Sequence, residues 1–158
     1  MASDAFSGAK SAFTLFIAYI NTVAQEIGIE RAVSLNTKMC ETLGAMQGKM
    51  LKEQAGIKEF DAKTAFPLVK SVPESLGVSF EVVEESPQRV VAKAGKCSLY
   101  AAAQALGVDA KTIEGMCHAS SLRFMDTIAK QLNPNLSWQL RKFRSAPDDS
   151  CVEELVLG

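Results

Sequence analysis

The stretch RVVAKAGKCSLYAAAQALG, residues Arg89–Gly107, changes from one kind of secondary structure to another in its middle. Its first six residues are typical of a β-strand, whereas Leu99–Leu106 favours a short α-helix. Gly95 separates the two elements, and Gly107 ends the helix. Cys97 lies at the joint, so the question is whether this bend presents a thiol or only buries one.

Two long amphipathic helices are predicted before this stretch. Apolar residues recur every three or four positions across Phe6–Ile27 and again across Glu30–Glu53. Gly44 and Gly48 lie one turn apart in the second helix, where they either let another helix come close, as in a dimer contact, or are tolerated on an exposed face. The apolar stripe predicted for the second helix consists of Ala32, Leu35, Met39, Leu43, Met46 and Met50.

A third helical region and a hairpin are predicted next. Residues 56–77 favour a helix with an N-cap at Asp61. Pro67 and Pro73 break or kink this helix unless they begin new helical turns. Residues 78–94 contain two short β-rich runs separated by a Ser-Pro-Gln turn, which predicts an antiparallel hairpin.

The residues after the opening stretch predict one longer helix and a second hairpin. Asp109 is a typical N-cap for a helix over residues 110–131, which an Asn-Pro-Asn sequence ends. The second hairpin spans residues 136–157, and Asp148 and Asp149 are expected to form its turn.

The order of these elements predicts the fold class. Three helices, a hairpin, two helices and a second hairpin indicate an α+β protein with a four-stranded antiparallel sheet covered by helices on one side. At 158 residues the chain is expected to form a single domain, with a helical part (1–77) and an α+β part (78–158).

Composition argues against several classes of partner. The net charge is −1 and no basic stripe is present, so no nucleic-acid partner is expected. The apolar run AFTLFIAYI is about half a membrane span, so no membrane partner is expected either. The first residues carry an acid where a signal peptide carries positive charge, which predicts a cytoplasmic protein.

Four cysteines, at positions 40, 97, 117 and 151, lie far apart and form no CxxC pair, so we expect free thiols. Cys97 lies at or next to the N-cap of a helix, where backbone N–H groups and the helix dipole stabilise a thiolate and lower its pKa. Lys96 adds positive charge nearby. This position predicts either an activated nucleophile or a cysteine buried for packing alone.

The remaining candidate residues leave alternatives open. Cys117 shares a helical face with apolar residues, which favours a core position, and Cys40 is interpreted as core. His118 is the one histidine; it points about 100° around the helix from Cys117, and it is either a surface residue or a general base. If Cys97, Cys117 and Cys151 converge, they would hold a divalent metal such as Zn²⁺ or Mn²⁺, or a single activated thiol would serve a hydrolase.

The second half of the sequence contains four short motifs. They are Cys97-Ser98, Met116-Cys117, Leu132-Asn133-Pro134 and Asp148-Asp149-Ser150-Cys151. Their order resembles the L-2-amino-thiazoline-4-carboxylic acid hydrolase-like family, over roughly residues 75–157, while the helical half fits in layout only. Ser98 replaces the proline typical of that family, and Val152-Glu153 replaces its aromatic residue after the last cysteine. These departures bear on the substrate more than on the fold.

This resemblance implies hydrolytic opening of a cyclic amidine, whose C=N carbon is attacked by water or a thiol. Cys97 would then be the nucleophile or a metal ligand, and His118 would carry a proton. Cys117 would line the ligand site. A substrate carboxylate would bind one of four basic residues: Arg123, Lys130, Arg141 or Arg144.

The sequence is also similar, more distantly, to small-molecule-binding domains of the vinyl-reductase type. Those domains place helices on an antiparallel sheet, and some hold zinc with cysteines beside an apolar pocket. Arg144 stands where another cysteine would be expected, which argues against the same metal site. This second resemblance implies a non-catalytic ligand-binding or sensor domain. Both resemblances imply a small-molecule ligand, and the N-terminal helices predict a homodimer.

Overall fold

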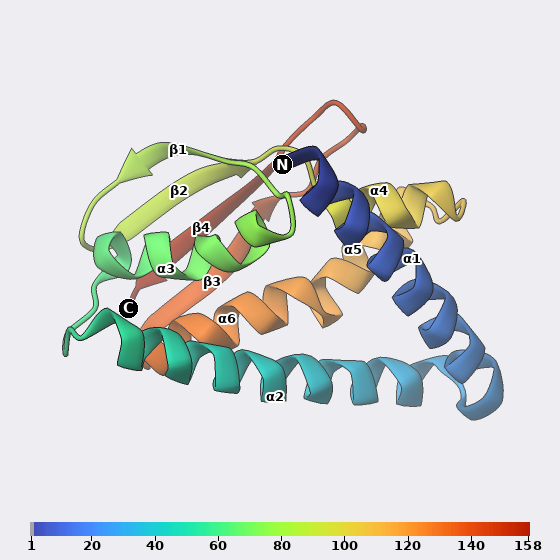
Figure 1. Ribbon diagram of the computed structural model, residues 1–158, viewed down its shortest axis with the longest axis horizontal. Coiled ribbons are helices and arrows are strands. Elements are labelled where there is room, and N and C mark those ends of the chain that lie inside the picture. Colours follow the sequence, from blue (N-terminus) through green and yellow to red (C-terminus); the bar gives the residue numbers. More distant parts are fainter. Residues whose placement is uncertain (1) are drawn as a thin grey trace.

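The computed structural model describes residues 2–158, and this range contains six helices and four strands. Their order confirms the predicted α+β class (Figure 1). The elements are α1 (Ala2–Ile27), α2 (Ile29–Ala55), α3 (Ala62–Ser75), β1 (Phe80–Glu85), β2 (Arg89–Ala94), α4 (Ser98–Ala105), α5 (Ala110–Ala119), α6 (Ser121–Leu132), β3 (Leu136–Lys142) and β4 (Cys151–Leu157).

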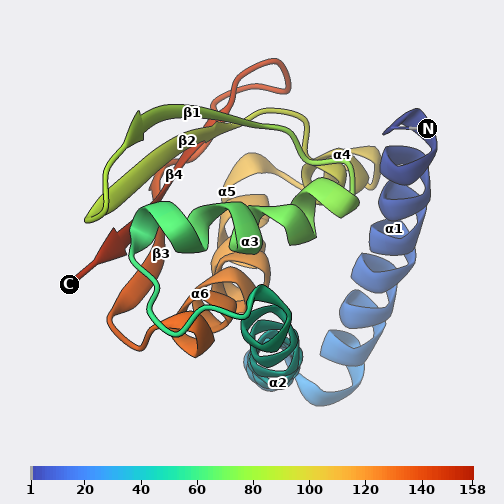
Figure 2. The same cartoon turned by 60° about the vertical axis from the view of Figure 1, so that its left-hand side comes forward.

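The four strands form one antiparallel sheet in the order β1-β2-β4-β3. The two predicted hairpins are present, and β2 and β4 join them in the middle of the sheet. Figure 2 shows the helices gathered on one side of this sheet, with α3 and α6 nearest to it and α2 beyond α6. Within residues 2–158, none of the helices combines the length and the apolar character that a membrane span requires.

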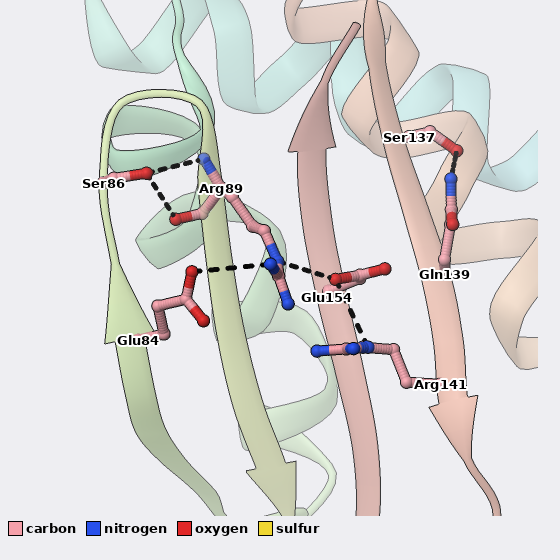
Figure 3. Close-up of polar contacts among 7 residues, drawn as sticks. All are labelled: Glu84, Ser86, Arg89, Ser137, Gln139, Arg141 and Glu154. Atoms are coloured by element: carbon pink, nitrogen blue, oxygen red, sulfur yellow. Dashed lines mark hydrogen bonds and ion pairs between the residues drawn. The ribbon is translucent and has the colours of Figure 1, made fainter.

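The outer face of the sheet carries charged side chains (Figure 3). The Arg89 Nε atom lies 2.9 Å from Glu154 Oε2, and Arg89 Nη1 lies 3.6 Å from Glu84 Oε1. Arg141 Nε lies 3.6 Å from the same Glu154 oxygen. Partly exposed ion pairs of this kind contribute little to stability, but they mark the face that meets water.

The inner face of the sheet packs against α3 and α6. Val90, Ala92 and Leu155 are almost fully buried there, in one cluster with residues of both helices. Trp138 stacks on Phe66 of α3, with ring centroids 5.4 Å apart. A second, smaller cluster joins α1, α4 and α5.

The glycine pair of α2 lies inside the molecule, against α6. A Cβ atom at Gly44 would lie 2.8 Å from the Phe124 carbonyl oxygen, and one at Gly48 would lie 2.7 Å from Gln131 Cβ. Close helix packing, the first of the two alternatives, therefore occurs within the chain, and the glycine face is not available for a dimer.

The predicted stripe of α2, by contrast, faces solvent at every position except Ala32. The exposed fraction is 50% for Leu35 and 60% for Met46. The reason is that α6 covers the glycine side of α2, which leaves the larger apolar side chains outside. The homodimer through the N-terminal helices stays a prediction, and this exposed stripe is now its candidate surface.

Two further expectations need correction. The helix predicted over residues 110–131 is two helices, because Ser120 leaves the helical conformation (φ −126°, ψ −87°) and its hydroxyl donates to the Met116 carbonyl. Helix α3 continues through both Pro67 and Pro73, neither of which ends it. Its N-cap is the predicted Asp61, whose carboxylate accepts from the Thr64 backbone N–H at 2.7 Å.

Candidate functional site

A cavity of about 380 Å³ lies between the two hydrophobic clusters, at the end of the sheet where β2 leads into α4. Its walls are mostly apolar and come from all three layers of the molecule. They include Phe13 and Phe16 of α1, Leu122 and Met125 of α6, and Phe80 of β1. This volume lies within the range of roughly 300–1,000 Å³ that is typical of small-molecule sites.

The mouth of the cavity lies where lining residues reach solvent. Met39 of α2 is 40% exposed and Leu76, which follows α3, is 39% exposed. Ala12 of α1 is exposed as well. These three exposed lining residues lie on α1, on α2 and just after α3.

All four cysteines line this one cavity, and all four are free thiols, as predicted. Cys97 comes from the β2–α4 joint, Cys117 from α5, Cys151 from the start of β4 and Cys40 from α2. The convergence that the sequence left conditional is thus present in the cavity wall. Cys40 also contributes to the wall, and it is buried, as its interpretation as a core residue predicts.

The thiols do not form a metal site in the described part of the chain. In residues 2–158, no three Cys, His, Asp or Glu side chains are grouped so that they would hold a metal ion. Arg144, whose Nε lies 3.4 Å from Cys151 Sγ, also places positive charge where a cation would bind. The arrangement of the described residues therefore does not favour the zinc or manganese ion expected from the sequence. Elemental analysis of the purified protein would test that expectation.

Burial keeps the Cys97 thiol protonated. Cys97 is the N-cap residue of α4, as expected, but its side chain makes no capping hydrogen bond. Burial raises the pKa of this thiol, and it outweighs the Tyr100 amide and the Arg144 charge, which lower it. The expected lowering of the Cys97 pKa by the helix N-terminus is therefore wrong in its net direction.

Burial also favours the neutral form of the thiols on α2 and α5. Burial raises the pKa of Cys117 well above its ordinary value, and the neighbouring Cys97 and Cys151 add to the rise. Burial likewise raises the pKa of Cys40, with a smaller effect of Glu41. At Cys40, Cys97 and Cys117 burial thus favours the neutral thiol over the thiolate.

Arg144 is a buried, positively charged residue in the wall of the cavity. It is only 3% exposed, and its Nη2 donates to the carbonyl oxygens of Ala94 (3.0 Å) and Gly95 (2.6 Å). Its guanidinium lies over the ring of Tyr100. Among the described residues no carboxylate lies within ion-pair distance of Arg144, and no hydrogen bond involves its Nη1.

Glu153 is the second charged residue of the wall. It lies on β4 between Cys151 and Leu155, which are buried on the inner face, and its Oε2 accepts a hydrogen bond of 2.7 Å from Trp138 Nε1. Burial raises the pKa of the Glu153 carboxyl, against the Trp138 hydrogen bond and the Arg144 charge.

Two predicted site residues lie elsewhere. His118 is exposed in the last turn of α5 and does not line the cavity, so the structure does not bring it to Cys97. Arg123 is exposed on α6, with its Nε 3.5 Å from Glu41 Oε1 on α2. Of the four basic residues considered for a carboxylate, Arg144 alone lines the cavity. Their catalytic and binding roles stay predictions.

Sequence reasoning missed Glu153 as a site residue. In the sequence, Val152-Glu153 stands out only because it replaces the aromatic residue that the family resemblance implies. The sequence CVEELVL does indicate that Glu153 faces the core. Side chains alternate between the two faces of a strand, so Glu153 shares a face with Cys151 and Leu155. A carboxyl group is rarely buried unless it is paired, so a Glu on the inner face of a strand is an informative position.

The sequence matches the model of the L-2-amino-thiazoline-4-carboxylic acid hydrolase family over residues 9–152. The match includes the helical half, which the short motifs did not reach. No curated protein matches the sequence.

A solved structure shares the fold. It is a trafficking protein particle complex subunit 3 from Naegleria fowleri, covalently bound to palmitic acid. The TM-score is 0.52 and the identity 10%, over 96% of this chain and 95% of that one. At this identity the likeness shows a common fold alone.

Proposed function

The chain belongs to the L-2-amino-thiazoline-4-carboxylic acid hydrolase family, and from this we propose that its cavity binds an amphipathic carboxylic acid. The apolar part of the acid fills the cavity, and the carboxylate binds Arg144. The observation that carries this proposal is a buried guanidinium without a carboxylate partner in the wall of an apolar cavity.

The charge of Arg144 favours an anionic ligand. Burial of an unpaired charge costs several kcal/mol by order of magnitude, and an anion placed beside it offsets that cost. The backbone carbonyls of Ala94 and Gly95 hold Nη2, so the guanidinium is fixed before the ligand arrives. Nη1 is the nitrogen left to donate to a carboxylate, the group that arginine recognises best.

The apolar walls favour an acid with a hydrocarbon body. Each buried CH₂ group contributes about 0.8 kcal/mol to binding from water. The fold neighbour is described as covalently bound to palmitic acid, which is itself an amphipathic carboxylic acid. Palmitic acid belongs to the class of molecule proposed here, which supports the proposal. The shared fold by itself does not imply that this chain binds the same ligand.

Binding without covalent chemistry is the function that this geometry supports best. The thiols of Cys97 and Cys117 have raised pKa values, and His118 lies outside the cavity, so no thiolate–histidine pair is assembled. This agrees with the ligand-binding or sensor role that the second resemblance implied.

Hydrolytic ring opening is the second candidate, and the family match favours it. In this case the carboxylate of an aminothiazoline substrate would bind Arg144. Water positioned by Cys97, or the Cys97 sulfur followed by water, would add to the C=N carbon, the ring C–N bond would break and the ring nitrogen would take up the proton. The candidate predicts product formation from 2-aminothiazoline-4-carboxylate. It fails if that compound stays intact with wild-type protein, or if Cys97→Ala retains the full rate.

The binding proposal is tested with decanoic acid as the probe, by calorimetry on the full chain. Arg144→Met should weaken binding roughly 10- to 100-fold, the value of a hydrogen bond to a charged group. Arg141→Met, on the outer face of the sheet, is the matched control and should leave the Kd unchanged. The proposal fails if wild-type protein binds neither decanoic acid nor 2-aminodecanoic acid, or if Arg144→Met binds the acid as tightly as wild-type protein does.

A further inference from the structure

We infer that Glu153 is a second recognition point in the cavity, which selects carboxylic acids that carry a hydrogen-bond donor close to the carboxylate. An α-amino acid with an apolar side chain and a cyclic amidine carboxylate both belong to this class. The inference rests on the proposed function, because it narrows the acid that binds Arg144.

The first reason is the direction in which Glu153 points. Glu153 and Glu154 are neighbours on β4, and strand geometry sends them to opposite faces. Glu154 lies on the outer face, where it pairs with Arg89 and Arg141 in water (Figure 3). Glu153 lines the cavity on the inner face, among side chains that are otherwise almost all apolar.

The second reason is that one oxygen of the Glu153 carboxyl accepts a hydrogen bond from the protein, whereas the other oxygen has no partner among the described residues. Its Oε2 accepts from Trp138 Nε1, and Trp138 is itself fixed by its stack on Phe66 and by an edge contact with Phe80 at 6.1 Å. In the part of the chain that the structure describes, Oε1 of Glu153 has no hydrogen-bond partner. A carboxyl oriented in this way is ready to bind a donor in the cavity.

The third reason is the spacing between Glu153 and Arg144. Arg144 donates to the carbonyl of Ala94, which pairs directly with Cys151 in the sheet. Glu153 lies two residues farther along β4, so its Cα atom lies roughly 7 Å from that of Cys151 on the same face. The Arg144 charge acts on the Glu153 carboxyl, yet the ion pairs found in residues 2–158 do not include one between these two groups. They therefore leave room for a head group between them.

A head group that suits both residues has an acceptor and a donor on nearby atoms. The carboxylate would accept from Arg144 Nη1, and an N–H group beside it would donate to Glu153 Oε1. A plain fatty acid satisfies Arg144 but leaves Glu153 without a partner in an apolar site, which costs affinity. Glu153 thus separates amino-acid-like and amidine-like acids from fatty acids.

The test compares decanoic acid with 2-aminodecanoic acid, which differ by one amino group beside the carboxylate. Wild-type protein should bind the amino acid at least tenfold more tightly. Glu153→Leu should abolish this preference, and Glu153→Gln, which keeps the size of the side chain and an acceptor for Trp138, should reduce it. Glu154→Gln is the matched control and should keep the wild-type ratio. Circular dichroism confirms that each variant is folded.

The outcomes separate this inference from the proposed function. If decanoic acid binds but the ratio of the two Kd values is the same in wild type, Glu153→Gln and Glu153→Leu, Glu153 does not select the ligand and the proposed function stands. If neither acid binds wild-type protein, the proposed function and this inference both fail.

Discussion

The guanidinium of Arg144 lies over the aromatic ring of Tyr100, with its central carbon 4.7 Å from the ring centroid. Arg144 follows β3 in the loop that leads to β4, and Tyr100 is in the first turn of α4, so this contact joins the turn of the second hairpin to the helix that Cys97 begins. A cation on an aromatic face is stabilised by about 0.5–2 kcal/mol, more when it is desolvated. The contact fixes the positive charge at one end of an apolar cavity.

Thiol labelling tests the state of Cys97. Because burial raises the pKa of this thiol, it should react with iodoacetamide at pH 7 more slowly than free cysteine does. The rate should rise as the pH exceeds 9, and bound decanoic acid should slow it further. Mass spectrometry of digested protein reports the rate at each cysteine, with Cys97→Ser as the reference.

Faster labelling of Cys97 than of free cysteine at pH 7 would contradict this prediction. It would indicate a thiolate in the cavity, and it would favour hydrolytic chemistry over binding alone.

Packing of α2 on α6 predicts that Gly48→Ala destabilises the protein. The new Cβ would lie 2.7 Å from Gln131 Cβ and 2.9 Å from the Ile128 carbonyl oxygen. Overpacking of this kind costs about 1–3 kcal/mol, which exceeds the gain of about 1 kcal/mol from better helix propensity. Urea unfolding measures the change in the free energy of unfolding.

The matched control for this change is Gly115→Ala in the middle of α5. A Cβ atom there meets nothing within 4 Å, so the substitution should stabilise the protein by roughly 0.5–1 kcal/mol through helix propensity. Equal effects of the two substitutions would show that α2 and α6 do not approach closely at Gly48.

Glu153 predicts a particular dependence of stability on pH. Burial raises its pKa above the ordinary value of 4.5, so between these two values the native state binds more protons than the unfolded state. Its contribution to the free energy of unfolding is therefore present below about pH 4.5 and is lost as the pH rises through the raised pKa. The Glu153→Gln substitution removes this dependence, because the Gln side chain does not titrate. The free energy of unfolding of the variant should therefore increase relative to that of wild-type protein as the pH rises.

Urea unfolding of both proteins from pH 4 to pH 8 measures this difference, and Glu154→Gln serves as the control for a carboxyl on the outer face. A difference between Glu153→Gln and wild type that stays constant over this range would mean that the Glu153 pKa is not raised.

The homodimer prediction is tested on the exposed stripe of α2. If two chains pair through this stripe, Leu43→Glu with Met46→Glu should convert a dimer to a monomer, because both side chains are about half exposed in the single chain (48% and 60%). Light scattering after size exclusion measures the mass. Lys111→Glu, exposed on α5, is the control, and a wild-type mass equal to one chain would refute the dimer.

Much of the fold could be predicted from local sequence. Asp61 and Asp109 were recognised as N-caps because each lies just before a helical pattern, and both accept the expected backbone hydrogen bond. Asp149 forms the β3–β4 turn, where it accepts from the Ser145 and Ser150 N–H groups. The break at Ser120 was missed because Ser121–Leu132 continues the same apolar pattern, so that periodicity alone shows one helix.

The sequence by itself determined the order of the elements, the turns and the position of Cys97 at a strand–helix joint, because these depend on neighbours within a few residues. Tertiary structure alone decided that four distant cysteines share one cavity, that Arg144 rather than Arg123 reaches it, and that His118 does not. It also decided the sign of the Cys97 pKa shift. The helix N-terminus lowers that pKa locally, but the layers packed around the thiol remove water from it, and this desolvation is the larger effect.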